Sequence, residues 1–148
     1  YGKDKVKEAL VYHGTNIGYV NSIVKNNFNW RLYGKNHGCI FGKGTSFADN
    51  LEIAEIYCDQ RANAKCIIVA RVLAANACLG NSRTVFPKKI NARKRFDTTM
   101  SPRKNDKVLV KYRDDEFLPT HIIYFTDIDK DKFDFHYAIE YEGRDFVS

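Results

Sequence analysis

Two glycine-bearing segments of the sequence combine residue types that could bind a ligand. Val11 to Thr15 is a short apolar run that contains His13-Gly14, and about thirty residues later Phe41 to Ala48 forms a loop with two glycines that re-enters a strand. A glycine lets a ligand approach the backbone closely, and a neighbouring histidine supplies a polar ring. Instead of binding a ligand, His13 could be a buried histidine whose hydrogen bonds are satisfied within the fold. The same alternative holds for Tyr57, farther along the chain, which could be a helix residue that faces the core.

Several blocks follow one another in an order that identifies a family. They are His13-Gly14-Thr15, the segment Asn26-Asn27-Phe28-Asn29-Trp30-Arg31, the Gly42 to Ala48 loop, Tyr57 at the end of the next helix, and Pro119-x-x-Ile122. The ordered set resembles the catalytic domain of the poly(ADP-ribose) polymerase family, the diphtheria-toxin-like ADP-ribosyltransferases. The resemblance covers roughly residues 10–126 and is greatest to the mono-ADP-ribosylating subgroup with CCCH zinc-finger and WWE-domain members.

This resemblance implies an α+β fold with two small mixed or antiparallel sheets and a groove for NAD between them. It implies NAD as the substrate, and no metal. By position, His13 would bond the adenosine ribose, the backbone of Gly14 would clamp the nicotinamide carboxamide, and Tyr57 would stack on the nicotinamide ring. The other positions expected to contact NAD are Thr15, Phe47, Ala48 and Ala54.

The reaction of this family explains why these residue types are needed. Breaking the bond between nicotinamide and ribose leaves a positively charged sugar, much as glycoside cleavage does. A carboxylate that stabilises the sugar and receives the acceptor's proton accelerates the transfer. A complete site therefore needs backbone amides, aromatic rings and one acid.

Three positions depart from the family pattern. His13, Ser46 and Thr120 occupy the catalytic positions, but the family has a tyrosine in place of Ser46, and its polymerising members have a glutamate in place of Thr120. Ala54 stands where the family has a serine that bonds the carboxamide. The losses at Ser46 and Ala54 together amount to about 2 kcal/mol of binding free energy, about thirtyfold in affinity for NAD. Without a carboxylate at Thr120, polymer formation is not expected.

Two functions remain open from the residues alone. In one, the domain is an NAD-dependent mono-ADP-ribosyltransferase that transfers a single ADP-ribose to an unidentified protein acceptor. In the other, it is a weak or inactive pseudoenzyme that keeps the fold and serves as a binding or scaffolding module, in association with RNA. Thr45 or Thr120 could supply a replacement hydrogen bond at the NAD site.

Three further polar residues bear on the site. His37 lies in the glycine-rich loop and could approach a ligand. His121 neighbours Thr120, but strand alternation is expected to send the two side chains to opposite faces. Glu116 is expected in a solvated turn, too remote to replace the missing acid.

Hydrophobic periodicity predicts two helices that position the motifs. The first is expected from Ile17 to Lys25, behind an Asn16 N-cap. The second begins at Asp49 or Asn50, where Asp49 and the residue three positions later form a start like a capping box. The face of the second helix that is expected to be apolar consists of Ile53, Ile56 and Tyr57.

The strand predictions rest on β-branched runs and alternation. Cys66 to Leu73 is a near-continuous apolar run, which predicts a buried strand. Lys107 to Tyr112 and Ile122 to Phe125 are predicted to pair as a hairpin around a turn at Arg113 to Glu116. Together with the early helices, these strands favour the α+β class.

Length and composition limit the class of protein. The 148 residues fit one domain, expected to be a fragment of a longer protein, with residues 127–148 as a C-terminal extension. No apolar run approaches the roughly 18 residues needed to cross a bilayer, so no membrane partner is expected. Four cysteines without a CxxC pair argue against a zinc site and favour an intracellular compartment, cytoplasmic or nuclear.

The net charge of +6 is unevenly distributed. Arg83 to Lys107, the basic segment, holds nine Lys/Arg against two Asp. Such a segment could attract nucleic acid or an acidic partner, while the simpler reading is a solvated basic loop. Within the segment, aromatic residues are too sparse to suggest stacked bases.

Overall fold

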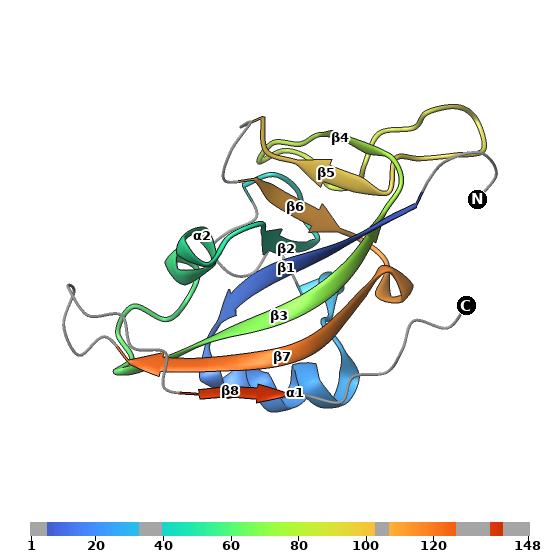
Figure 1. Cartoon of the computed structure of the whole chain (residues 1–148). Helices are drawn as coiled ribbons and strands as arrows, with labels where there is room; N and C mark the ends of the chain where they lie inside the picture. Colours follow the sequence, from blue (N-terminus) through green and yellow to red (C-terminus); the bar gives the residue numbers. More distant parts are fainter. Residues whose placement is uncertain (1–5, 33–39, 103–106, 127–136, 141–148) are drawn as a thin grey trace.

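The fold is seen in a computed structural model that describes residues 6–32, 40–102, 107–126 and 137–140. Strands dominate these residues, and the helices are short (Figure 1). The helical segments are η1 (Ile17–Tyr19), α1 (Val20–Asn26), η2 (Trp30–Leu32), α2 (Leu51–Ile56) and η3 (Asp114–Glu116). The strands are β1 (Lys7–Thr15), β2 (Thr45–Ala48), β3 (Ala64–Ala74), β4 (Ala77–Leu79), β5 (Thr98–Met100), β6 (Val108–Lys111), β7 (Phe117–Thr126) and β8 (Tyr137–Glu140).

The sheet runs in the order β4-β5-β6-β2-β1-β3-β7-β8. Neighbouring strands are antiparallel except β4 and β5, which are parallel. β1 pairs with β3 along its whole length, from Lys7 with Ala74 to Thr15 with Cys66, but it meets β2 through a single residue pair, Tyr12 with Ala48. The sheet therefore consists of two four-stranded halves joined at one narrow junction.

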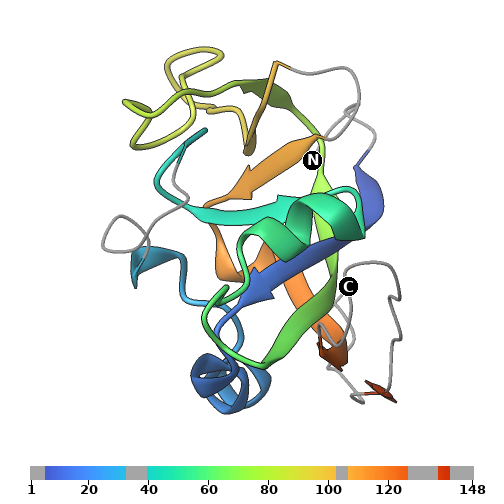
Figure 2. The same ribbon diagram turned by 90° about the vertical axis from the view of Figure 1, so that its left-hand side faces the viewer.

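The α+β class is confirmed, but the expectation of two separate sheets needs correction. One continuous ladder connects all the described strands, because β1 and β2 pair at Tyr12 and Ala48 before they diverge. The two halves turn away from each other at this point, as the side view shows (Figure 2). The groove that was expected between two sheets is therefore expected where β1 and β2 diverge within one sheet.

The first helix follows its prediction, and the second differs from it. Asn16 accepts a hydrogen bond from the backbone N–H of Gly18 at 2.8 Å, so the predicted N-cap is confirmed. In α2 the cap is Asn50, whose side chain accepts from the N–H of Ile53 at 2.9 Å. Its buried residue is Ala54, and Ile53 packs against the core as predicted, whereas Ile56 is 67% exposed, so the predicted apolar face was wrong at Ile56. The close approach of the α2 backbone to β1 decides which side of this short helix is covered.

The predicted hairpin is also wrong, although its strands exist. β6 pairs with β2 and β5, and β7 pairs with β3 and β8, so the segment after β6 leads from one half of the sheet to the other. This link can be short because the sheet curls and brings its two halves close together. Phe117 at the start of β7 packs against Phe47 of β2, with ring centroids 5.9 Å apart. The predicted buried strand over Cys66 to Leu73 lies within β3 and is confirmed.

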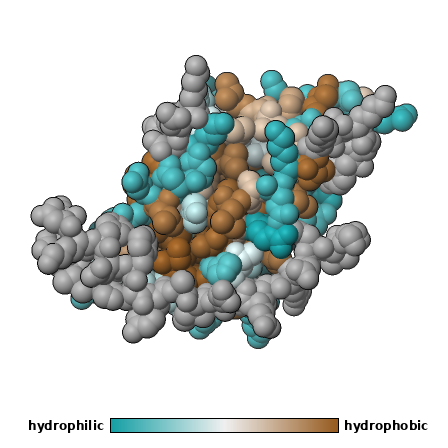
Figure 3. All heavy atoms as spheres, viewed as in Figure 1, coloured by the Kyte–Doolittle hydropathy of each residue, from teal (hydrophilic) through white to brown (hydrophobic). Residues whose placement is uncertain are grey.

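The core has two main parts, one on each face of the central strands. On one face, Ile23 of α1 and Phe28 pack with Phe47, Ile68 and Phe117. On the other face, Ala54 of α2 packs with residues of β2, β3 and β7, namely Ala48, Ile67 and Phe125. Hydrophobic side chains are visible over the middle of the face seen in Figure 1 (Figure 3). None of the described helices has the length and apolar character that crossing a membrane would require.

Candidate functional site

His13 and Ser46 meet where β1 and β2 diverge. Nδ1 of His13 lies 2.8 Å from the carbonyl oxygen of Ser46. Because a carbonyl only accepts, Nδ1 carries the hydrogen and donates it. In the neutral ring this leaves Nε2 with the lone pair, so that Nε2 is an acceptor for a hydroxyl group.

The surroundings of His13 keep its ring neutral. The ring is 7% exposed and packs against Phe28 and Phe47, with centroid distances of 5.0 and 5.7 Å. Burial lowers the pKa of His13 from 6.5 to about 4, although the hydrogen bond to the Ser46 carbonyl acts in the opposite direction. At neutral pH this histidine therefore serves as a hydrogen-bonding group and not as a cation.

Gly14 is required by its packing against α2. A Cβ at this position would lie 1.9 Å from the carbonyl oxygen of Ala54 and 3.1 Å from Sγ of Cys58. The α2 backbone therefore rests directly on β1, and no side chain fits between them. This packing brings Gly14 and Ala54 together and explains the glycine by the fold alone.

Two hydroxyl groups beside this junction lack partners. The side-chain oxygens of Thr45 and Ser46 are buried and have no hydrogen bond among the described residues. Leaving a buried hydroxyl unpaired costs about 1–3 kcal/mol, so such groups are uncommon unless a ligand or water satisfies them. Neighbouring residues of a strand point to opposite faces, so one ligand would reach only one of these hydroxyls. Ser46 is the less buried of the two, and a polar group of NAD would satisfy it.

The remaining positions that were predicted to contact NAD are Thr15, Phe47, Ala48 and Tyr57. Phe47 and Ala48 are buried, one in each part of the core. The carbonyl of Thr15 accepts a hydrogen bond from Sγ of Cys66 at 3.4 Å. Tyr57 is half-buried and caps the C-terminus of α2, with its N–H bonded to the carbonyl of Ala54 at 3.1 Å. Their predicted roles toward NAD stay predictions.

Thr120 lies in a β-bulge, which overturns the expectation for His121. Val69 is opposite His121 and Ala70 is opposite Pro119, so Thr120 is the extra residue of β7. The bulge interrupts the alternation of side chains, and the Oγ1 of Thr120 lies 3.0 Å from Nδ1 of His121. The Thr120 hydroxyl donates to the carbonyl of Val69 at 3.2 Å, so it accepts from the His121 ring.

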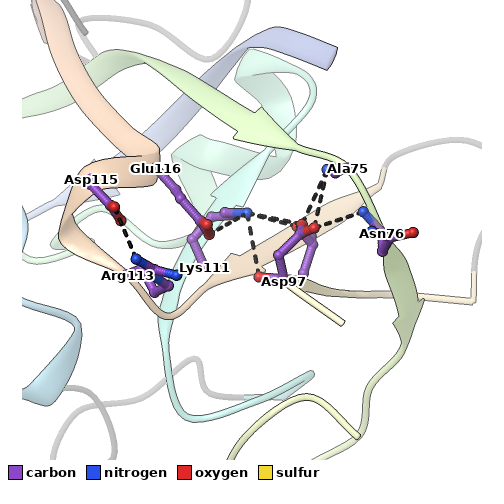
Figure 4. Close-up of polar contacts among 8 residues, drawn as sticks. Ala75, Asn76, Asp97, Lys111, Arg113, Asp115 and Glu116 are labelled. Carbon is purple, nitrogen blue, oxygen red and sulfur yellow. Dashed lines mark hydrogen bonds and ion pairs between the residues drawn. The ribbon is translucent and has the colours of Figure 1, made fainter. Parts of the chain in front are cut away.

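Glu116 is not a solvated residue, contrary to the expectation for its turn. It is buried with Lys111, whose Nζ lies 3.1 Å from Oε1 of Glu116 and 3.3 Å from Oδ1 of Asp97 (Figure 4). Asp97 also accepts from the backbone N–H groups of Ala75 and Asn76. The turn buries this carboxylate because the amine of Lys111, itself fully buried, needs a counter-charge.

The environment shifts the pKa values of the two acids in opposite directions. Burial raises the pKa of Glu116, and the charge of Lys111 offsets this only in part. Burial also acts to raise the pKa of Asp97, but hydrogen bonds from Thr98 and Asn76 and the charge of Lys111 outweigh it, so that this pKa is lowered. In the sequence, only the acidic turn hints at this triad, because nothing local pairs Lys111 with Asp97.

Two further expectations concern metals and the glycine-rich loop. Within the described ranges, no three His, Cys, Asp or Glu residues gather as metal ligands would. His37 lies outside the described residues. The hydroxyl of Thr45, a predicted replacement donor, is buried and has no hydrogen-bond partner among the described residues.

Comparison with known proteins gives a consistent result. Residues 2–143 match the family model described as the poly(ADP-ribose) polymerase catalytic domain. The chain is 28% identical over 127 residues to protein mono-ADP-ribosyltransferase PARP12 of Homo sapiens, with 84% of this chain and 18% of the relative covered. It is 27% identical over 146 residues to protein mono-ADP-ribosyltransferase PARP11 of Mus musculus, with 84% of this chain and 44% of the relative covered.

A third relative is similar to a shorter part of the chain. Protein mono-ADP-ribosyltransferase PARP10 of Mus musculus is 29% identical over 121 residues, which cover 78% of this chain and 12% of the relative. The chain thus spans less than half the length of each of these relatives.

Proposed function

Because this chain belongs to the poly(ADP-ribose) polymerase catalytic domain family, we propose that it binds NAD where β1 and β2 diverge and transfers a single ADP-ribose to a protein acceptor. The observation that carries this proposal is the buried, unpartnered hydroxyl of Ser46, beside the hydrogen bond from His13 to the Ser46 carbonyl. This hydroxyl needs a polar partner, and a dinucleotide supplies one.

Each residue has a distinct role in this proposal. Nε2 of His13 accepts a hydrogen bond from a ribose hydroxyl, since Nδ1 is committed to Ser46. The backbone of Gly14 holds the carboxamide, and the ring of Tyr57 stacks on the nicotinamide. NAD supplies an ADP-ribosyl group: its bond to nicotinamide breaks as the acceptor's nucleophile bonds to the ribose, and neutral nicotinamide leaves.

The proposal is for transfer of one ADP-ribose and not for polymer formation. Thr120 has no acidic group, and its hydroxyl is hydrogen-bonded to Val69 and His121. Glu116 cannot replace the acid because it is ion-paired with Lys111. The acceptor's own carboxylate would have to supply the base.

The second candidate is a pseudoenzyme that binds NAD weakly or not at all. Ser46 and Ala54, which replace an aromatic ring and a hydroxyl of the family pattern, favour it, because each substitution removes about 1 kcal/mol of binding. The two candidates differ first in whether NAD binds, and then in whether the acceptor gains mass.

The decisive experiment is calorimetric titration of the chain with NAD. Tyr57→Ala should weaken binding about fivefold or more, because it removes the stacking ring. Ile56→Ala on the same helix is the control, since Ile56 is exposed and should leave binding unchanged. No heat at millimolar NAD would reject the transferase proposal, and binding without modified protein in a mass-spectrometric assay would favour the pseudoenzyme.

An intracellular location, in the cytoplasm or the nucleus, is part of the same proposal. The described cysteines Cys58, Cys66 and Cys78 are free thiols, which is typical of a reducing compartment. The proposal requires of the acceptor protein that it supply a nucleophile. The basic segment is proposed as a separate contact surface for nucleic acid.

A further inference from the structure

A pocket of about 430 Å³ lies beside the basic segment, between β4 and the loop that leads to β5. This loop lies at the end of the sheet opposite α1 and β8 (Figures 1 and 2). Three cationic side chains line the pocket, those of Arg83, Lys88 and Arg95, together with the apolar side chains of Val85 and Phe86. No acidic residue is among those that line it.

The cations of the pocket are not neutralised within the fold. Among the described residues, no carboxylate forms an ion pair with Arg83, Lys88 or Arg95. Asp97 is the acid closest to them in sequence, but its carboxylate faces Lys111 and the backbone N–H of Asn76. Asp97 is the only acidic residue in the described part of this loop, and its charge is paired in the interior of the protein. The outer surface of the loop therefore stays positively charged.

Aromatic rings accompany these cations, although the basic segment alone holds few of them. Phe86 is 51% exposed and meets Trp30 edge-on, with centroids 6.0 Å apart. Tyr112 lies 6.3 Å from Phe86 on another side, and the guanidinium of Arg31 lies 4.7 Å from the centroid of the Trp30 ring. The basic segment itself remains poor in aromatic residues, and η2 and the residue that follows β6 bring two further rings next to Phe86 from distant parts of the chain.

We propose that this pocket binds single-stranded nucleic acid, with Arg83, Lys88 and Arg95 on its phosphates and a base against the exposed face of Phe86. A cationic groove with an exposed aromatic ring is the arrangement that sequence-tolerant single-strand binders use. A duplex hides the faces of its bases, so it would leave Phe86 without a partner. An acidic peptide would use the cations but not the ring. The proposal does not depend on NAD binding, because none of the NAD-contact positions lines this pocket.

The test is fluorescence anisotropy with labelled oligouridine of about ten nucleotides, repeated over a range of salt concentrations. The triple variant Arg83→Gln, Lys88→Gln and Arg95→Gln should bind at least about tenfold more weakly and reduce the slope of log Kd against log salt by about two. Phe86→Ala should weaken binding about tenfold with the slope unchanged, because stacking releases no counterions.

A matched control separates a pocket from general positive charge. The triple variant Lys7→Gln, Lys25→Gln and Arg61→Gln removes the same charge from exposed positions outside the pocket, and it should change the affinity less than about threefold. Thermal unfolding of each variant shows that the fold is retained. Failure of NAD to bind would not affect this result, and calorimetry with NAD on the pocket variant keeps the two proposals distinguishable.

Three results would overturn the proposal. The first is an equal loss of affinity in both triple variants, which would mean non-specific electrostatics. The second is binding of a duplex or of oligoglutamate of equal charge as tight as that of oligouridine, which would assign the pocket to another partner. The third is an unchanged affinity in Phe86→Ala, which would remove the stacked base.

Discussion

His13 donates its Nδ1 hydrogen to the carbonyl oxygen of Ser46 over 2.8 Å, across the point where β1 and β2 stop pairing. This bond joins the two residues that stand at the family's first two catalytic positions, even though one of them has lost its aromatic ring. It also holds the imidazole in a single tautomer. Because the acceptor is a backbone carbonyl, this bond does not depend on which side chain stands at position 46.

The buried ring of His13 should make stability depend on pH. Below about pH 6.5 the histidine of the unfolded chain takes up a proton, whereas the folded ring resists protonation down to about pH 4. The unfolded state then binds more protons, so the free energy of unfolding should fall by about 3 kcal/mol between pH 7 and pH 4 through this group.

Urea unfolding at several pH values measures this effect, with His13→Gln as the reference. The variant should lack the histidine's share of the decrease. Equal pH profiles for the two proteins would mean that the ring is already accessible to protons in the folded state.

Gly14→Ala should destabilise the fold by about 3 kcal/mol, as overpacking of a tight contact does. The new methyl group would collide with the carbonyl oxygen of Ala54, a backbone atom that cannot move without α2. Gly18→Ala is the matched control, because its Cβ would meet only the side-chain oxygen of Asn16 at 3.2 Å. Thermal unfolding should separate the two variants clearly, and similar melting temperatures would contradict the close packing of α2.

Lys111→Met should cost about 3–5 kcal/mol of stability, because it leaves buried carboxylates without their counter-charge. Adding Glu116→Gln should recover part of the loss, since the remaining side chain is neutral. The control is Arg113→Met: its pair with Asp115 is exposed on both sides, and such pairs contribute about 0–1 kcal/mol. Chemical unfolding measures all three, and a small effect of Lys111→Met would show that the triad is solvated.

Restoring the family residues should strengthen NAD binding. Ser46→Tyr adds the second aromatic wall and Ala54→Ser adds a hydroxyl for the carboxamide, and each is expected to contribute about 1 kcal/mol, about fivefold in affinity. Calorimetry with NAD on the single and double variants checks this. If neither variant improves binding, the nicotinamide is not held between these positions.

Local sequence patterns correctly predicted the elements that depend only on neighbouring residues. The Asn16 cap needs only its own helix turn, and β3 needs only its run of β-branched residues. Within the site, the motif order selected His13, Ser46, Gly14 and Ala54 as candidates, but the contacts of His13 with Ser46 and of Gly14 with Ala54 come from the structure alone.

The errors arose where a distant part of the chain decides the outcome. The hairpin failed because alternation shows that β6 and β7 are strands but does not select their partners. The relation of Thr120 to His121 failed because one inserted residue breaks the period of two. The burial of Glu116 could not be read from its turn, since Lys111 and Asp97 lie in separate elements.

The single pair of Tyr12 with Ala48 has a consequence for how such a domain can evolve. Each half of the sheet keeps its own ladder, so side chains beside the junction can be exchanged without loss of a backbone hydrogen bond. Ser46 lies beside that junction, so its side chain can change while both ladders keep their backbone hydrogen bonds. The architecture thereby separates, at this position, the residues that build the scaffold from the side chain that would meet a ligand.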